Sequence, residues 1–360
     1  MTEFQTNKAR FAEFKLADSL NKSIVDGEIK VRIDRFAFTA NNITYAVLGE
    51  RFKYWDFFPA AEGSSNNWGI IPVWGFADVI ESRTAEVPVG DRLFGYFPPA
   101  DELIMMPANV SKDKFIECSQ HRSHLSVSYN SYRRVFAEPN YDQSFDNEWM
   151  LLFVLHLTSF VIYDMLKRND WFGAKQIIIT SASSKTGTGL AYGLANDDAA
   201  PNVIALTSKR NYNIVESMRV YDDVFSYDTL NQVDAGTSTL IVDMSANAKM
   251  LGRLHDHLGE NLKFTSNVGM THWNERQQAK SINLGRSDVF FAPIQIQKLI
   301  KELGHYEFER RSMHYIMHSI VKSRDWLKVQ ELSGLNELAN VYSGVCEGEL
   351  TADKGLVVVM

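Results

Sequence analysis

Hydrophobic and polar residues divide the chain into two parts with different periods. In the first part, residues 28–38 (EIKVRIDRFAF) alternate apolar and polar side chains, which is the period of a half-buried strand. Residues 69–82, 92–97 and 101–107 are also strand-like and are separated by glycine and proline. The first ~110 residues are therefore predicted to be mostly β, with turns between the strands.

From about Trp149 onward, helical stretches alternate with short, fully apolar runs. Apolar runs of this length between helices indicate a parallel sheet that is covered on both faces. Their spacing of ~25 residues suits repeated β-α units and predicts an α/β, doubly wound domain of the Rossmann type. The five predicted strands are residues 176–180, 203–207, 223–227, 239–243 and 263–267.

Outside these runs the pattern is less regular. Residues 295–303 and 310–327 are predicted to be amphipathic helices, and the chain ends in a helix, a loop and an apolar strand. Residues 111–147 have no clear period, and we expect an irregular insertion that covers a cleft.

Composition narrows the class of protein. A length of 360 residues suggests two or three domains, and 45% hydrophobic with 22% charged residues is ordinary for a soluble globular protein. The net charge of −7 argues against a nucleic-acid-binding protein, whose surface would be basic. The only cysteines, Cys118 and Cys346, can form neither a disulfide framework nor a four-cysteine zinc site.

One apolar stretch, residues 149–166, approaches the length of a membrane span. It contains His156 and Asp164, and charged groups inside a span are costly, so a buried helix of a soluble protein is predicted. The N-terminal segment is polar and lacks the apolar run of a secretory signal. The predicted location is the cytoplasm.

The first candidate site is the segment QIIITSASSKTGTGLAYGLA, residues 176–195. An apolar strand runs into a turn of small residues that opens a helix, and such a turn lets backbone N–H groups approach a pyrophosphate. Only Gly187 and Gly189 survive of the usual G-x-G-x-x-G pattern, because Ser181 to Ser184 occupy the earlier positions. A polar β-α turn without a ligand is the alternative interpretation.

The end of the second strand of this domain carries Thr207, Ser208, Lys209 and Arg210. In this fold that position meets the adenosine ribose, where an acidic residue indicates NAD. Two cations and a hydroxyl can instead hold a 2′-phosphate through charge-assisted bonds, which favours NADP(H). A solvated basic loop is the alternative.

Segments along nearly the whole chain resemble, in the same order, the zinc-free medium-chain dehydrogenase/reductases of the quinone and enoyl reductase type. The resemblance implies a GroES-like substrate domain, residues 1–147 and 326–360, and a Rossmann NADP(H)-binding domain, residues 148–325. It also implies a small-molecule substrate and a homodimer. The matching segments are NWGIIPVWGFADVIES, VPVGDRLFGYF, LTS at 157–159, ITSASSKTG, DVFSY and EGELTADKGLVVVM.

Cofactor contacts follow from this resemblance residue by residue. Lys185 departs from the family, which usually has glycine there, so it either adds charge to the phosphates or obstructs the turn. The implied positions are Thr158 at the nicotinamide; Ser184, Lys185, Thr186 and Gly187 at the pyrophosphate; Ser208, Lys209 and Arg210 at the 2′-phosphate; Tyr227 at the adenosine; and Met244, Ser245 and Gly269 at the nicotinamide ribose.

The implied reaction is hydride transfer from NADPH to a polarised C=C or C=O of a small acceptor, without zinc. Residues 39–49 resemble the family segment that faces the nicotinamide: Asn41 matches its asparagine, while Thr44 replaces its aspartate. Tyr45 can donate a proton or a hydrogen bond, unless it packs in the domain interface. Tyr129 belongs to a polar and aromatic group that either shapes the acceptor pocket or is a solvated helix.

Other functions are also considered. Cys118, His121 and His124 are close in sequence, but ordinary surface histidines are favoured over a metal site. Tyr163 and Lys167 form a Y-x-x-x-K pattern that precedes the glycine turn, which is the wrong order for a short-chain dehydrogenase. The main alternative is an NADPH-binding sensor or scaffold that has lost its catalytic groups.

Overall fold

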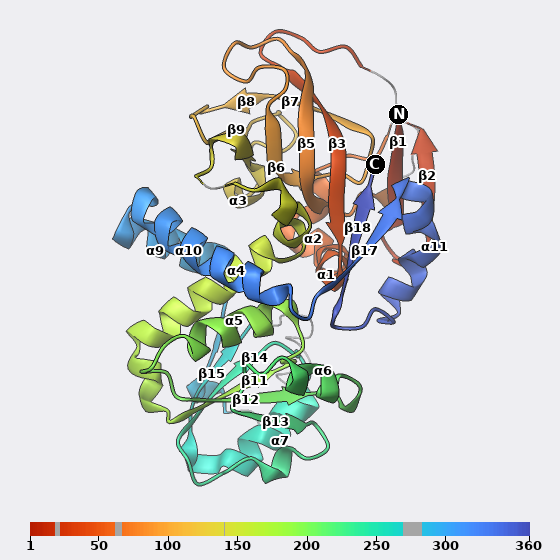
Figure 1. Cartoon of the computed structure of the whole chain (residues 1–360). Coiled ribbons are helices and arrows are strands. Elements are labelled where there is room, and N and C mark those ends of the chain that lie inside the picture. Colours follow the sequence, from red (N-terminus) through yellow and green to blue (C-terminus); the bar gives the residue numbers. More distant parts are fainter. Residues whose placement is uncertain (19–21, 62–66, 140, 269–282) are drawn as a thin grey trace. The chain divides into compact units, whose positions relative to one another are not determined.

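The computed structural model describes residues 1–18, 22–61, 67–139, 141–268 and 283–360. These residues form two compact units (Figure 1). The first unit consists of Met1–Leu151 and Lys328–Met360, and the second of Leu152–Leu327. The chain leaves the first unit within helix α4 (Asp146–Arg168) and returns to it at strand β17 (Lys328–Ser333).

The second unit is built on a six-stranded sheet with the order β13-β12-β11-β14-β15-β16. Every ladder between neighbouring strands is parallel. Counted from β11, this is the order 3-2-1-4-5-6 of doubly wound nucleotide-binding folds, so the predicted fold class is confirmed. The strands are β11 (Gln176–Thr180), β12 (Asn202–Thr207), β13 (Asp223–Ser226), β14 (Thr239–Asp243), β15 (Leu262–Asn267) and β16 (Ser287–Val289).

Both faces of this sheet are covered by helices. Ile177 and Ile179 of β11 lie in one core, and Ile178 between them lies in another with Met250 and Leu254 of α7. Successive residues of a strand point to opposite faces, so a strand covered on both sides is apolar throughout. The helices are α5 (Lys185–Ala195), α6 (Tyr212–Ser217), α7 (Ala248–Leu258), α9 (Ala292–Leu303) and α10 (His305–Ser323).

The first unit contains a larger sheet with the order β17-β18-β3-β5-β6-β10-β9-β8, and β7 also pairs with β3. Its ladders are antiparallel except that between β17 and β18. A separate small sheet has the order β2-β1-β4. The strands are β1 (Thr2–Asn7), β2 (Phe14–Asp18), β3 (Ile29–Phe38), β4 (Trp68–Gly69), β5 (Val73–Ser82), β6 (Arg92–Phe97), β7 (Glu102–Met105), β8 (Pro107–Ala108), β9 (Lys114–Glu117), β10 (Ser131–Arg134) and β18 (Lys354–Val359).

Two predictions for the first unit need correction. The segment 111–147 is not irregular, because β9 and β10 add strands to the large sheet beyond β6. The polar N-terminal segment forms β1 and β2, which were not predicted because their side chains lack a continuous apolar pattern. The helices here are α1 (Ala40–Val47), α2 (Gly49–Phe52), α3 (Val127–Asn130) and α11 (Gly334–Cys346).

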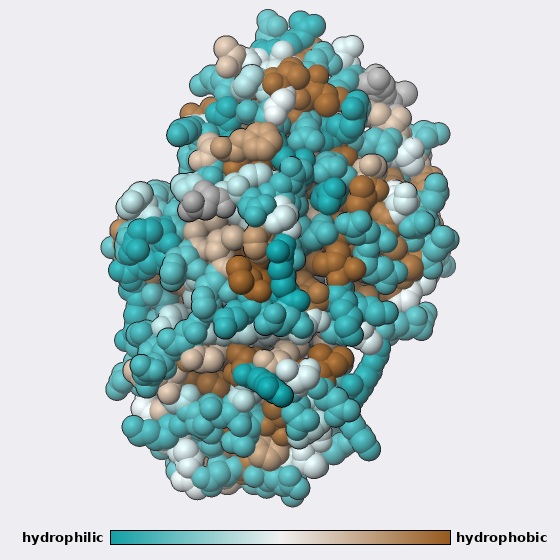
Figure 2. All heavy atoms as spheres, viewed as in Figure 1, coloured by the Kyte–Doolittle hydropathy of each residue, from teal (hydrophilic) through white to brown (hydrophobic). Residues whose placement is uncertain are grey.

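The apolar stretch at 149–166 lies in α4. One helix of the described chain, Gln143–Arg168, is long and apolar enough to cross a membrane, and 61% of its most apolar window is buried, as in a core helix. Two of its polar side chains bond inside the protein: Nδ1 of His156 contacts Ser319 Oγ at 2.7 Å, and Ser159 donates to the Thr186 carbonyl at 2.7 Å. On the face shown in Figure 2, hydrophilic residues predominate and hydrophobic ones form small separate groups.

Candidate functional site

The turn between β11 and α5 keeps the geometry of a glycine turn although serines replace the glycines. Ser181 has a φ of 46°, a left-handed conformation that glycine adopts most easily. Ser184 is the N-cap of α5, and its hydroxyl accepts the N–H of Gly187 at 3.0 Å. A Cβ at Gly187 would lie 3.0 Å from that hydroxyl oxygen, so a larger residue there would crowd the cap.

Part of the hydrogen-bonding capacity of this turn is used internally. The N–H of Ser181 donates to the Tyr227 hydroxyl at 3.0 Å, and the N–H of Ser184 donates to the Ser181 carbonyl at 2.8 Å. Among the hydrogen bonds within the described residues, none uses the N–H of Ser183 or Thr186. Two amide donors at a helix N-terminus suit an anion such as a pyrophosphate.

The basic segment after β12 is held against this turn. Lys209 and Arg210 are exposed and lie with Asn211 in one turn of 3-10 helix, Lys209–Asn211, while Ser208 before it is half-buried. The side-chain amide of Asn211 donates to the hydroxyl of Ser183 at 2.9 Å. The two segments that the sequence assigns to the pyrophosphate and the 2′-phosphate are therefore adjacent.

Residues at the end of β14 also contact this turn. Asp243 is fully buried and accepts hydrogen bonds from the hydroxyls of Thr180 and Ser245, each at 2.7 Å. Met244 donates its N–H to Thr180 Oγ1 at 3.0 Å, and its sulfur accepts from the Ser184 hydroxyl at 3.6 Å. These contacts join the carboxyl ends of β11 and β14, where ligands bind in open α/β sheets.

Two other predicted cofactor contacts stay predictions. Thr158 donates its hydroxyl to the Val154 carbonyl within α4 at 3.1 Å. Gly269 lies outside the described residues.

Lys185 is the first residue of α5 and half-buried, near His156. Burial lowers the pKa of His156 to about 3, and the charge of Lys185 acts in the same direction.

The predicted catalytic residues lie in an aromatic cluster of the first unit. Asn41 and Tyr45 belong to α1, which begins at a capping box formed by Thr39 and Asn42. Tyr45 is 4% exposed, and its oxygen accepts the indole N–H of Trp74 at 3.1 Å. Burial raises the pKa of Tyr45 well above its usual range, so the phenol is neutral at ordinary pH.

Tyr129 of α3 joins the same cluster. Its hydroxyl lies 3.0 Å from that of Tyr54, and its ring centroid lies 6.2 Å from that of Tyr45. Tyr45 and Tyr129 thus pack against other aromatic side chains of the first unit. Tyr54 and Tyr96 were not predicted as site residues. The aromatic run 52–58 gave a signal for Tyr54, but nothing local to β6 distinguishes Tyr96 from an ordinary strand residue.

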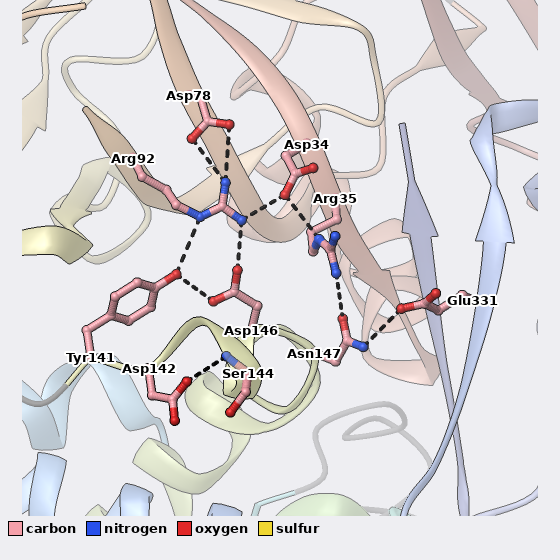
Figure 3. Close-up of polar contacts among 10 residues, drawn as sticks. All are labelled: Asp34, Arg35, Asp78, Arg92, Tyr141, Asp142, Ser144, Asp146, Asn147 and Glu331. Carbon is pink, nitrogen blue, oxygen red and sulfur yellow. Dashed lines mark hydrogen bonds and ion pairs between the residues drawn. The ribbon is translucent and has the colours of Figure 1, made fainter. Parts of the chain in front are cut away.

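A second buried polar cluster surrounds Arg92 of β6 (Figure 3). Its guanidinium contacts Asp34 and Asp146 at 2.7 Å each and Asp78 at 3.0 Å. Asp146 begins α4 and also accepts from the Tyr141 hydroxyl at 2.6 Å. Burial raises the pKa of Asp146, and the bonds from Tyr141 and Arg92 oppose that rise. We call these five residues the Arg92 network.

The Arg92 network reaches the returning chain as well. Arg35 contacts Asp34 at 3.0 Å and donates to Asn147 of α4 at 3.4 Å. Asn147 in turn donates to Glu331 of β17 at 3.2 Å. The segments at which the chain leaves and re-enters the first unit are therefore joined to each other through Asn147, which also contacts strand β3 (Figure 3).

The residues considered for a metal bind other partners. The Cys118 thiol donates to the Met106 carbonyl at 3.2 Å, and Nε2 of His121 lies 3.2 Å from the Phe57 carbonyl. Over the described ranges, no three His, Cys, Asp or Glu side chains gather in a way that could hold a metal ion.

Comparison with known proteins places the chain in a family. Residues 36–351 match the family described as "Protein of unknown function (DUF2855)". The chain belongs to this family. No curated protein matches the sequence.

Solved structures of reductases share the fold of this family member. The NADPH complex of CurA from Vibrio vulnificus has a TM-score of 0.59 at 12% identity, covering 96% of this chain and 94% of CurA. The quinone oxidoreductase of Coxiella burnetii has a TM-score of 0.56 at 14% identity, covering 100% and 99%. The Etr1p complex with NADP and crotonyl-CoA has a TM-score of 0.59 at 11% identity, also covering 100% and 99%.

At these identities the similarity establishes the fold alone. The chain has the medium-chain reductase fold, a Rossmann domain and a GroES-like domain, as the sequence predicts.

Proposed function

We propose that this protein is an oxidoreductase that binds NADP(H) in its second unit. It would transfer hydride to a polarised C=C or C=O of a small organic acceptor, without zinc. The observation that carries the proposal is the 2.9 Å hydrogen bond from Asn211 to Ser183. It holds Lys209 and Arg210 beside a turn with unused amide donors, so one place offers partners for both a pyrophosphate and a 2′-phosphate.

The described residues fit the groups of this cofactor. The N–H groups of Ser183 and Thr186 would bind the pyrophosphate, and Lys209 and Arg210 would pair with the 2′-phosphate. When bound, NADPH supplies the hydride. The presence of NADPH in the CurA complex and of NADP in the Etr1p complex supports this choice of cofactor.

The acceptor would bind in the first unit near Asn41, Tyr45 and Tyr129. An acceptor that gains hydride develops negative charge on its oxygen and needs one proton. A neutral phenol can stabilise that oxygen by donating a hydrogen bond, and it can also supply the proton. The raised pKa of Tyr45 keeps this phenol protonated.

The first test is fluorescence titration with NADPH and with NADH. We expect tight binding of NADPH and weak binding of NADH to the wild type. The variant Lys209→Ala/Arg210→Ala should raise the Kd for NADPH by about 10–100-fold, because charge-assisted bonds to the 2′-phosphate are lost. The Kd for NADH should stay unchanged, since NADH has no 2′-phosphate.

Lys298→Ala/Lys301→Ala is the matched control, because it removes two exposed charges from α9 of the same unit. If both double variants weaken NADPH binding equally, the effect is one of net charge and the 2′-phosphate site is wrong. Binding of NADPH without turnover of any unsaturated ketone, quinone or aldehyde would support the sensor instead. The homodimer and the cytoplasmic location stay predictions from the sequence.

A further inference from the structure

Tyr96 lies at the centre of the aromatic cluster of the first unit. It belongs to β6 and is fully buried. Its ring centroid lies 4.9 Å from that of Tyr129, 5.1 Å from Trp74 and 5.5 Å from Tyr45. Next to it, Gly95 leaves room for the ring of Tyr132, because a Cβ there would lie 2.4 Å from that ring.

The hydroxyl of Tyr96 has no hydrogen-bond partner among the described residues. Buried polar groups are normally paired, and an unpaired one lowers stability. The neighbouring Tyr132 shows the usual arrangement, since its hydroxyl accepts from Arg122 at 2.8 Å and donates to the Tyr96 carbonyl. The two buried tyrosines differ in whether the hydroxyl is paired.

The other polar groups of the cluster leave it with an excess of donors. The indole of Trp74 donates to the Tyr45 oxygen, and Tyr54 and Tyr129 share one hydrogen bond. A phenol carries one proton, so this pair and Tyr96 hold more protons than the described bonds use. A ligand that complements such a group accepts hydrogen bonds and donates none, as a carbonyl oxygen does.

The charge around Tyr96 favours an uncharged ligand. Among the described residues, the cation whose charge acts on Tyr96 is Arg122, which is fully buried and already paired. Its guanidinium contacts Glu117 at 2.9 Å and Asn130 at 2.7 Å, in addition to Tyr132. A carboxylate ligand would find no available positive charge there, whereas a neutral carbonyl needs only donors. The aromatic side chains suit a flat, conjugated compound.

Part of the cluster meets the surface. Trp74, Tyr129 and Asn41 are half-buried there, while Tyr45, Tyr54 and Tyr96 are buried. The ring of Tyr96 therefore packs against two side chains, Trp74 and Tyr129, that themselves meet the surface.

We propose that the Tyr96 hydroxyl donates a hydrogen bond to the oxygen of an uncharged conjugated carbonyl compound, and so selects the acceptor substrate. This inference rests on the proposed oxidoreductase function and names a residue that determines its specificity. It also explains why an unpaired hydroxyl is kept in the core: the partner arrives with the ligand.

The test is Tyr96→Phe, with Tyr132→Phe as the matched control. Removing the unpaired hydroxyl should raise the Tm by roughly 1–3 °C, because no bond is lost and a buried polar group disappears. Removing the paired hydroxyl of Tyr132 should lower the Tm. For benzalacetone as acceptor, Tyr96→Phe should raise KM about tenfold, since one hydrogen bond to the ligand is lost. The Kd for NADPH should be unchanged.

A second measurement needs no cofactor. Benzalacetone should quench tryptophan fluorescence of the wild type at lower concentration than its analogue with a methylene in place of the carbonyl. Tyr96→Phe should remove that difference. If the wild type shows this difference in quenching and Tyr96→Phe loses it although NADPH does not bind, that result would support the carbonyl site and contradict the oxidoreductase function.

Two results would contradict the proposed role of Tyr96. A lower Tm for Tyr96→Phe, whatever the acceptor, would show that the hydroxyl is bonded in the unliganded protein, for example to a buried water, and would overturn the proposal. Turnover with an unchanged KM in Tyr96→Phe would overturn it too, while leaving the proposed function intact.

Discussion

The Arg92 network and the tyrosine cluster around Tyr96 are both buried in the first unit, but they differ in whether their central polar group has hydrogen-bond partners. Arg92 is 4% exposed and is surrounded by three carboxylates and the Tyr141 hydroxyl, so its donors are used. Tyr96 is fully buried with an unpaired hydroxyl. The Arg92 network holds the protein's own segments together, whereas the Tyr96 hydroxyl is the group for which we propose a partner from outside.

The largest effect should follow from removing the centre of the paired network. Arg92→Met leaves Asp34 and Asp146 without their cation, and breaking a buried ion pair from one side costs about 3–5 kcal/mol. Urea unfolding measures the loss. Arg35→Gln is the control, because a half-buried pair is worth only about 0–1 kcal/mol. If the two variants lose similar amounts of unfolding free energy, the burial of Arg92 does not increase the contribution of its ion pairs to stability.

A smaller change in stability is expected from His255, a buried side chain whose hydrogen bonds require the neutral imidazole. His255 of α7 is 5% exposed; its Nε2 lies 3.1 Å from Thr265 Oγ1, and its Nδ1 accepts the N–H of Asn283 at 3.0 Å. Burial lowers the pKa of His255 from 6.5 to about 4. The unfolded chain therefore binds the proton first as the pH falls.

The folded protein should therefore become less stable as the pH falls. The stability contributed by His255 is complete above about 6.5 and is lost progressively as the pH falls toward 4. The loss should be on the order of 2 kcal/mol. It is measured as the difference in unfolding free energy between wild type and His255→Gln across that range. A constant difference would mean that the histidine is not neutral and buried in the folded protein.

The smallest effect concerns the turn of the second unit, where hydroxyls stand in for glycines. Ser181→Gly removes the left-handed strain but also frees the unfolded chain, so stability should change by less than about 0.5 kcal/mol. Ser181→Val should lose more than about 1 kcal/mol, because a β-branched residue resists a positive φ. Thermal unfolding distinguishes the two, and equal effects would contradict the left-handed conformation at Ser181.

Much of the second unit was predictable because its signals are local. The run QIIIT gives β11 with the predicted bounds, since a strand covered on both faces must be apolar throughout. Strand β16 was missed, because three residues, SDV, carry no such run. The proximity of Lys209 to the turn followed from the fold, but the bond from Asn211 to Ser183 did not.

The first unit was less predictable, because its pairings join distant segments. The segment 111–147 has no period of its own, and β9 and β10 form only against β6 and each other. Asn41, Tyr45 and Tyr129 were chosen by resemblance and by residue type. Their common location in one cluster was not visible in the sequence, and Tyr54 and Tyr96 were absent from the choice.

By itself, the sequence determined five of the six strands of the parallel sheet, the small-residue turn and the cations after β12, because each is a pattern within a few neighbouring residues. Only the tertiary structure decided which buried hydroxyls are paired. Tyr132 finds Arg122, and Tyr96 finds no described partner, although both are tyrosines in strands of the same sheet. Hydrogen bonding depends on atoms brought together from remote segments, and that information exists only once the chain has folded.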